Sequence, residues 1–172
     1  MKLDLAVLSE DNRALAALAK ANDDCAPYGL SLSDAQMKAI VVHHHHSCRK
    51  FHLLAMGEGI LGNLMRTFAD CYCMKQDILE EQILKLSDLF LQYRKEVSRT
   101  LFTDEELLDL MREQFEKICY GDLEEMEENC LPYFLDAIQA GLVPCDDEDS
   151  NNSVVRWDHD RYFQAMKEMC TW

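Results

Sequence analysis

The sequence is poor in glycine and proline, with six and three of these residues among 172. A β-sandwich or β-barrel needs turn residues every 8 to 12 positions or so, and this chain has too few to supply them. Nor does any apolar run approach the roughly 20 residues that span a bilayer. Because hydrophobic residues still make up 48% of the chain, the composition favours a folded helical protein without membrane spans.

Basic residues are also scarce, since 17 Lys and Arg stand against 32 Asp and Glu for a formal net charge of −15. Binding to phosphate backbones or anionic lipids relies on clustered Lys and Arg, so we expect neither nucleic acid nor a membrane as a partner. The charge is uneven. Residues 104–128 hold eleven acidic and two basic side chains, whereas residues 35–66 hold four basic side chains, one acidic side chain and five histidines. These regions either attract one another within the fold, or face a partner, or are simply solvated helix faces.

The amino-terminal residues do not resemble a secretion signal, because Met-Lys-Leu-Asp-Leu contains an acid and no long apolar core follows it. We therefore expect a cytoplasmic protein. In a reducing compartment, most of its eight cysteines are interpreted as small buried apolar groups rather than as disulfides.

One stretch, Asp77 to Arg99, shows the strongest helical periodicity. Its apolar residues recur at alternating steps of four and three, which places them on one helical face: Leu79, Ile83, Leu86, Phe90, Tyr93 and Val97. Further apolar residues lie off that stripe, so this helix is expected to be central and to have several neighbours. At 172 residues the chain has the length of one domain. We predict an all-α, single-domain, irregular helical bundle of about six or seven helices, with no internal repeat.

Helix boundaries follow from capping residues. Ser9 or Asp11 is expected to begin a first helix that ends near Asn22. Residues 1–8 alternate loosely, which is enough for an extended arm but too short to establish a strand. Ser33 with Gln36, and Thr103 with Glu106, match the capping box at the start of two later helices. The first of these is predicted to continue to about residue 55. A short helix is expected over residues 60–68.

Other boundaries come from glycine, aspartate and proline. Gly121 is expected to stop a helix in a left-handed conformation, and Asp122 to cap the next one. Pro132 must kink or divide that helix because it lacks an N–H donor. We predict a bundle core over residues 1–141, an acidic linker over 142–153, and a C-terminal helix over 154–172 that docks on the core or on a partner.

Three turn segments resemble an uncharacterised bacterial family of small acidic helical proteins, a domain of unknown function. They are Tyr28-Gly29-Leu30-Ser31-Leu32-Ser33, Gly57-Glu58-Gly59-Ile60-Leu61 and Gly121-Asp122-Leu123-Glu124. The resemblance spans about residues 25–140 and implies a bacterial cytoplasmic protein, with no activity attached. The histidine run and the residues after Gly141 lie outside it.

The most conspicuous motif is a run of four histidines, His43 to His46. On a helix, His44, Cys48 and His52 follow at steps of four, so adjacent members can direct imidazole or thiolate donors to a metal such as Zn²⁺. A tetrahedral site needs further donors, for which Cys71 and Cys73 are candidates. The alternative is that His44 and Cys48 are partly buried and the other three histidines of the run face outward. On that interpretation there is no native cofactor, and any Zn²⁺ or Ni²⁺ taken up by the run is adventitious.

No coherent catalytic set is present, and we assign no catalytic residue. Cys48 beside His44 or His52 imitates a nucleophile with its base, but no oxyanion-hole motif accompanies it. Two hypotheses remain. The first is a noncatalytic helical module for protein–protein interaction or regulation, with a protein partner or a homo-oligomer. The second is a metal- or small-ligand-binding protein that uses the His-rich helix 43–52.

Overall fold

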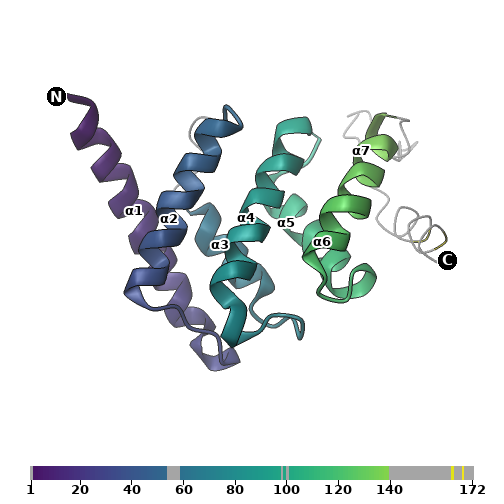
Figure 1. Ribbon diagram of the computed structural model, residues 1–172, viewed down its shortest axis with the longest axis horizontal. Coiled ribbons are helices and arrows are strands. Elements are labelled where there is room, and N and C mark those ends of the chain that lie inside the picture. The colour runs from purple at the N-terminus through teal and green to yellow at the C-terminus, as the bar shows by residue number, and fades with distance from the viewer. Residues whose placement is uncertain are drawn as a thin grey trace, which may run out of the picture.

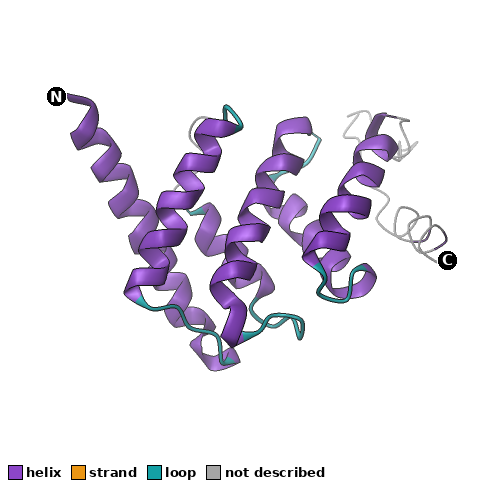
Figure 2. Ribbon diagram, in the orientation of Figure 1, coloured by secondary structure: helices purple, strands orange, loops and turns teal. Residues whose placement is uncertain are grey.

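The computed structural model describes residues 2–53, 59–97, 99, 101–139, 164 and 168, and these residues are helical or lie in turns and loops, with no strand among them (Figure 2). In chain order the segments are α1 (Lys2–Cys25), η1 (Ala26–Tyr28), α2 (Asp34–Lys50), α3 (Ile60–Phe68), η2 (Gln76–Ile78), α4 (Leu79–Glu96), α5 (Asp104–Glu113), η3 (Gln114–Ile118), α6 (Leu123–Glu125), η4 (Met126–Cys130) and α7 (Leu131–Gln139). The predicted all-α single-domain bundle is confirmed. In the described part of the chain, none of the helices has both the length and the apolar character that crossing a membrane requires.

The helices lie in two layers (Figure 1). In the rear layer α1 packs against α3 and α3 against α5. In the front layer α2 packs against α4, and α4 in turn contacts α6 and α7. Helix α4 is therefore the middle element of the front layer and also contacts α3 and α5 behind it.

The side chains of α4 explain this central position. All six residues of its predicted apolar stripe are buried, as are Leu89 and Leu91 beside that stripe. Burial on more than one face is what a helix with neighbours on several sides requires. Rear-layer packing is tight where Gly62 of α3 meets α1, because a Cβ added there would lie 3.1 Å from the carbonyl oxygen of Ala17. The absence of a side chain at this position lets the two helices approach.

Most of the predicted helix ends are confirmed. Ser33 with Gln36 and Thr103 with Glu106 each form both hydrogen bonds of the capping box. Gly121 has φ = 87°, and the carboxylate of Asp122 accepts hydrogen bonds from the next helix. Pro132 lies in α7, which directly follows the π-helical stretch η4, so the hydrogen-bonding pattern changes just before the proline while the chain stays helical from residue 123 to 139.

Two boundaries were predicted wrongly. Helix α1 begins at Lys2 and ends at Cys25, so residues 2–8 are not an extended arm. Alternation over so few residues is a weak signal, and extending an existing helix costs little once it has been nucleated. Helix α2 ends at Lys50 rather than near residue 55. The predicted linker 142–153 and, apart from residues 164 and 168, the C-terminal helix 154–172 lie outside the described residues, so both stay predictions.

Candidate functional site

Helix α2 presents two faces of different character. Five of its side chains are buried: Met37, Ile40, Val41, His44 and Ser47. The opposite side of the helix is solvent-exposed and carries Lys38, Val42 and His46. The histidine run thus crosses the boundary between the core and solvent, which is why its four members have different surroundings.

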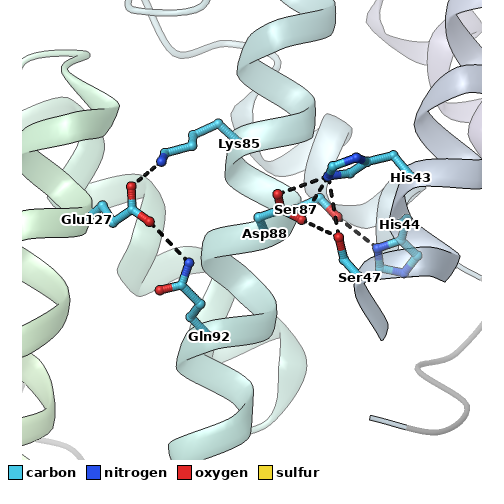
Figure 3. Close-up of polar contacts among 8 residues, drawn as sticks. All are labelled: His43, His44, Ser47, Lys85, Ser87, Asp88, Gln92 and Glu127. Atoms are coloured by element: carbon cyan, nitrogen blue, oxygen red, sulfur yellow. Dashed lines mark hydrogen bonds and ion pairs between the residues drawn. The ribbon is translucent and has the colours of Figure 1, made fainter. Parts of the chain in front are cut away.

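His43 joins α2 to the middle helix α4 through a carboxylate. Its Nε2 lies 2.9 Å from Oδ2 and 3.0 Å from Oδ1 of Asp88, and the hydroxyl of Ser47 donates to Oδ1 of Asp88 at 2.7 Å (Figure 3). Ser47 is buried, while His43 and Asp88 are partly exposed. In a serine hydrolase the serine donates to the imidazole and the aspartate holds the other ring nitrogen. Here the serine donates to the aspartate, and its oxygen lies 3.4 Å from the same Nε2 of His43 that faces the carboxylate, so the three side chains clamp two helices together.

His44 makes a second connection one position further along α2. Its Nδ1 lies 2.8 Å from the hydroxyl oxygen of Ser87 on α4, and its Nε2 lies 3.5 Å from Sγ of Cys48 (Figure 3 shows the serine contact). Burial, with a smaller contribution from neighbouring His45, lowers the pKa of His44 to about 4. Burial, followed by the charge of Asp88, raises the pKa of the Cys48 thiol to about 11. Both groups are consequently uncharged near neutral pH, and the thiolate–imidazolium pair of cysteine hydrolases is not formed here.

The remaining histidines of the run complete the pattern. His45 pairs through Nδ1 with the carboxylate of Asp11 on α1, whereas His46 is exposed. Within the run, only His44 is buried and only His46 is exposed. His43 and His45, which the alternative to a metal site placed outward, are instead half-buried and hydrogen-bonded to carboxylates on two other helices.

The third proposed metal ligand, His52, lies beyond the end of α2 and has φ = 55°. The N–H of His52 donates to the carbonyl oxygen of Arg49, and the N–H of Leu53 donates to that of Cys48. This is a Schellman ending, with a histidine in the left-handed position that glycine usually occupies. The assumption that His52 continues the helical spacing of His44 and Cys48 is therefore wrong.

Metal binding itself is not tested by this geometry and stays a prediction. Within the described residues, no three His, Cys, Asp or Glu side chains gather closely enough to hold an ion. His44 and Cys48 are adjacent, as the spacing predicted. Cys71 and Cys73, the suggested additional donors, are buried in the loop between α3 and α4, and Cys73 lies against Gly121.

An open, shallow depression of about 560 Å³ lies on the exposed side of α2 and is lined by Lys38, Ala39, Val42, His43 and His46. We call it the α2 depression. Val42 is 63% exposed although it is an aliphatic side chain. Helix α2 carries three basic residues and one acidic residue, so its charge is opposite to that of the chain as a whole. The depression thus combines an apolar centre with a neutral to basic rim.

Helix α4 also forms polar contacts on its side away from α2. The ammonium group of Lys85 and the amide of Gln92 both contact the carboxylate of Glu127 in η4 (Figure 3). The hydrogen bond from Lys85 is the main reason that the pKa of Glu127 is lowered. Helix α4 therefore makes polar contacts with α2 on one side, through Asp88, and with η4 on the other side, through Lys85 and Gln92.

Ser47, Ser87 and Asp88 organise this site, and none of the three was predicted from the sequence. Asp88 lies among buried residues of the central helix, next to the buried Ser87 and Leu89, but α4 carries several other charged residues and the sequence does not distinguish Asp88 from them. The spacing within α4 does not reveal that the partners come from α2, because that depends on how the two helices pack.

Comparison with protein families gives a match over most of the chain. Residues 17–143 match the model of DUF6323, which is described as a family of unknown function. No curated protein and no solved structure matches the chain. The match spans most of the chain and includes the histidine run, which the sequence-based resemblance had placed outside the family pattern. The bacterial source and cytoplasmic location that the resemblance implied stay predictions.

Proposed function

Since the chain belongs to this family of unknown function, DUF6323, we propose from its site that it is a noncatalytic helical interaction module and that the α2 depression binds an acidic, amphipathic helix of a partner protein. The observation that carries the proposal is the exposed Val42 at the centre of a surface lined by Lys38 and His46. Val42 is an exposed aliphatic side chain on a helix that is net basic, although the chain as a whole is acidic. Such a surface suits a partner helix with one apolar anchor residue surrounded by carboxylates.

The contacts that hold α2 against α4 support this role. The clamp between His43, Ser47 and Asp88 and the contact between His44 and Ser87 hold α2 against α4. A binding helix whose rotation is fixed beforehand loses less conformational entropy when the partner arrives. These contacts lie on the inner side of α2 and leave its outer side, with Lys38 and Val42, available for a partner.

A photo-cross-linking residue placed at Val42 tests the proposal. The control carries the same residue at Tyr72, which is similarly exposed at 67% but lies in the loop between α3 and α4. We expect position 42, and not position 72, to cross-link to a distinct protein through an acidic helical segment. The purified partner should then bind more weakly to Val42→Glu and to Lys38→Glu, and binding should weaken as salt concentration rises.

Three results would contradict the proposal. Cross-linking of position 42 to a second copy of this chain would replace the partner with self-association. A cross-linked segment without acidic residues would overturn the charge argument. Equal yields at positions 42 and 72 would show that the α2 depression is not a specific surface.

A second candidate function is metal binding by His44 and Cys48, with His52 as a further ligand. It is favoured by the 3.5 Å separation between Nε2 of His44 and Sγ of Cys48 and by Ser87, which engages the other ring nitrogen as outer partners of metal-bound histidines do. Because the thiol must lose its proton to bind a metal, Zn²⁺ affinity should rise with pH.

This candidate is tested with protein purified without a nickel column and stripped with a chelator. Titration with Zn²⁺ should show weaker binding by Cys48→Ser and His44→Gln and unchanged binding by the exposed control, His46→Gln. If His46→Gln weakens binding as much as the other two variants, the histidine run captures metal adventitiously and the candidate fails.

A further inference from the structure

Two cysteines far from α2 lie in contact with one another. Sγ of Cys119 is 3.2 Å from Sγ of Cys130, and both residues are in the reduced form. Their side chains are buried, at 5% and 1% exposure. A disulfide has an S–S distance of about 2.05 Å, so the two sulfur atoms need to approach by only about 1 Å to form the bond.

The local backbone places these sulfur atoms together. Cys119 directly follows the π-helical segment η3, and Cys130 is the last residue of the π-helical segment η4. A π-helical turn contains one residue more than an α-helical turn and so rotates the following side chains around the helix axis. Between the two segments the chain reverses at Tyr120 and Gly121, which have φ values of 49° and 87°. The side chains of Cys119 before the reversal and Cys130 after it both point into the core, where their sulfur atoms meet.

The turn is held from both sides. The N–H of Gly121 donates to the carbonyl oxygen of Phe115 at 2.8 Å, and the N–H of Asp122 donates to that of Cys119 at 2.9 Å. On the other side, Cys73 fills the space next to the α-carbon of Gly121. The two thiols therefore face one another across a constrained reversal, and their proximity does not depend on a loose loop.

From this geometry we propose that Cys119 and Cys130 are a redox modification site that forms a reversible intrachain disulfide by exchange with a small-molecule disulfide such as oxidised glutathione. The Cys119 thiolate attacks one sulfur of the oxidant, forms a mixed disulfide and releases one glutathione thiolate. The Cys130 thiolate then attacks the Cys119 sulfur, forms the Cys119–Cys130 bond and releases the second glutathione thiolate. The two cysteines lose two electrons and two protons, and one oxidised glutathione becomes two reduced molecules.

Order of attack follows from exposure. Cys119 is the more accessible of the two and adjoins Tyr120, which is 75% exposed, so the oxidant meets Cys119 before Cys130. Cys130 lies deeper and precedes α7. The bond would join the end of η3 to the start of α7 and close a loop that contains α6. It would thereby restrict the movement of α7 relative to α5 and η3.

The test uses the full chain under native conditions. After incubation with oxidised glutathione, remaining thiols are alkylated in acid-quenched samples and the protein is digested with a glutamyl endopeptidase without reduction. Cleavage sites at Glu124, Glu125, Glu127 and Glu128 lie between the two cysteines. The expected result is an intact mass lower by two hydrogens and a pair of peptides that stays joined until a reductant is added.

Variants assign the order of the two steps. Cys130→Ser should stop at a glutathione adduct on Cys119, whereas Cys119→Ser should form neither that adduct nor the link. The control is Cys25→Ser, which removes a different buried thiol and should leave formation of the link unchanged. Three results would overturn the proposal. The peptides that contain Cys119 and Cys130 could be separate after oxidation, they could be joined only in denaturant, or another pair of cysteines could be joined faster. Peptide mapping of the unsubstituted protein decides this even if a serine variant does not fold.

Discussion

Nε2 of His43 on α2 lies 2.9 Å from Oδ2 of Asp88 on α4, and the buried hydroxyl of Ser47 donates to the same carboxylate. One acidic residue of the central helix thus receives two polar side chains that are one turn apart on its neighbour. This contact sets the rotation of α2, and with it the side of α2 that Val42 and Lys38 present to solvent.

The first prediction concerns this carboxylate. Asp88→Ala should lower the free energy of unfolding by about 1–3 kcal/mol, because the buried Ser47 hydroxyl loses its acceptor and His43 loses its partner. Urea denaturation measures the change. Asp109→Ala, which removes an exposed acid from α5, is the control and should change stability by less than about 0.5 kcal/mol. Equal effects of the two substitutions would show that the clamp contributes nothing.

The second prediction concerns the pH dependence that His44 gives to stability. Its pKa is about 4 in the folded protein because of burial and the neighbouring His45, and about 6.5 when unfolded. Between these values the unfolded chain binds more protons than the folded chain, so stability falls as the pH falls from about 6.5 towards 4. Above pH 6.5 this contribution is fully present.

Removal of the imidazole should therefore matter less in acid. The stability difference between the native chain and His44→Gln should shrink by about 2 kcal/mol from pH 7 to pH 5, as measured by urea denaturation at both values. Asp88 opposes the shift and His43 adds to it, but burial dominates. A stability gap for His44→Gln that is equal at pH 7 and pH 5 would contradict the assignment.

The third prediction concerns the end of α2. His52 has φ = 55° in the left-handed position of a Schellman ending, a conformation that costs a non-glycine residue about 1–2 kcal/mol. His52→Gly should raise the melting temperature, with a gain of up to about 1 kcal/mol once the greater freedom of glycine in the unfolded chain is subtracted. His46→Gly, within the helix, should instead lower stability by about 1 kcal/mol. Destabilisation by His52→Gly would mean that the imidazole itself makes a needed contact.

The fourth prediction concerns Gly121. Its φ of 87° disfavours any side chain, and an added Cβ would lie 2.9 Å from Cβ of Cys73. Gly121→Ala should therefore destabilise the protein by about 2–4 kcal/mol through backbone strain and overpacking. Gly59→Ala is the matched control, because nothing lies within 4 Å of an added Cβ there and its φ is −94°. Thermal denaturation that ranks the two variants equally would refute the argument.

Features that depend on adjacent residues were predictable. The capping boxes at Ser33 and Thr103 and the left-handed Gly121 all follow from interactions within four or five residues. The apolar stripe of α4 also needed only its own spacing. Besides the start of α1, an exception is His52, where a local ending was missed because the signal for it is normally glycine and here is histidine.

What the sequence determined by itself is the set of helices, most of their ends and the faces they bury, because each depends on backbone hydrogen bonding and side-chain spacing along one segment. Only the tertiary structure decided that Asp88 meets His43 and Ser47, or that α2, α4 and α7 share a layer. The contacts of Asp88 with His43 and Ser47 join residues more than 40 positions apart. They depend on how the surfaces of two helices fit together, and the spacing of residues within one helix does not determine that fit.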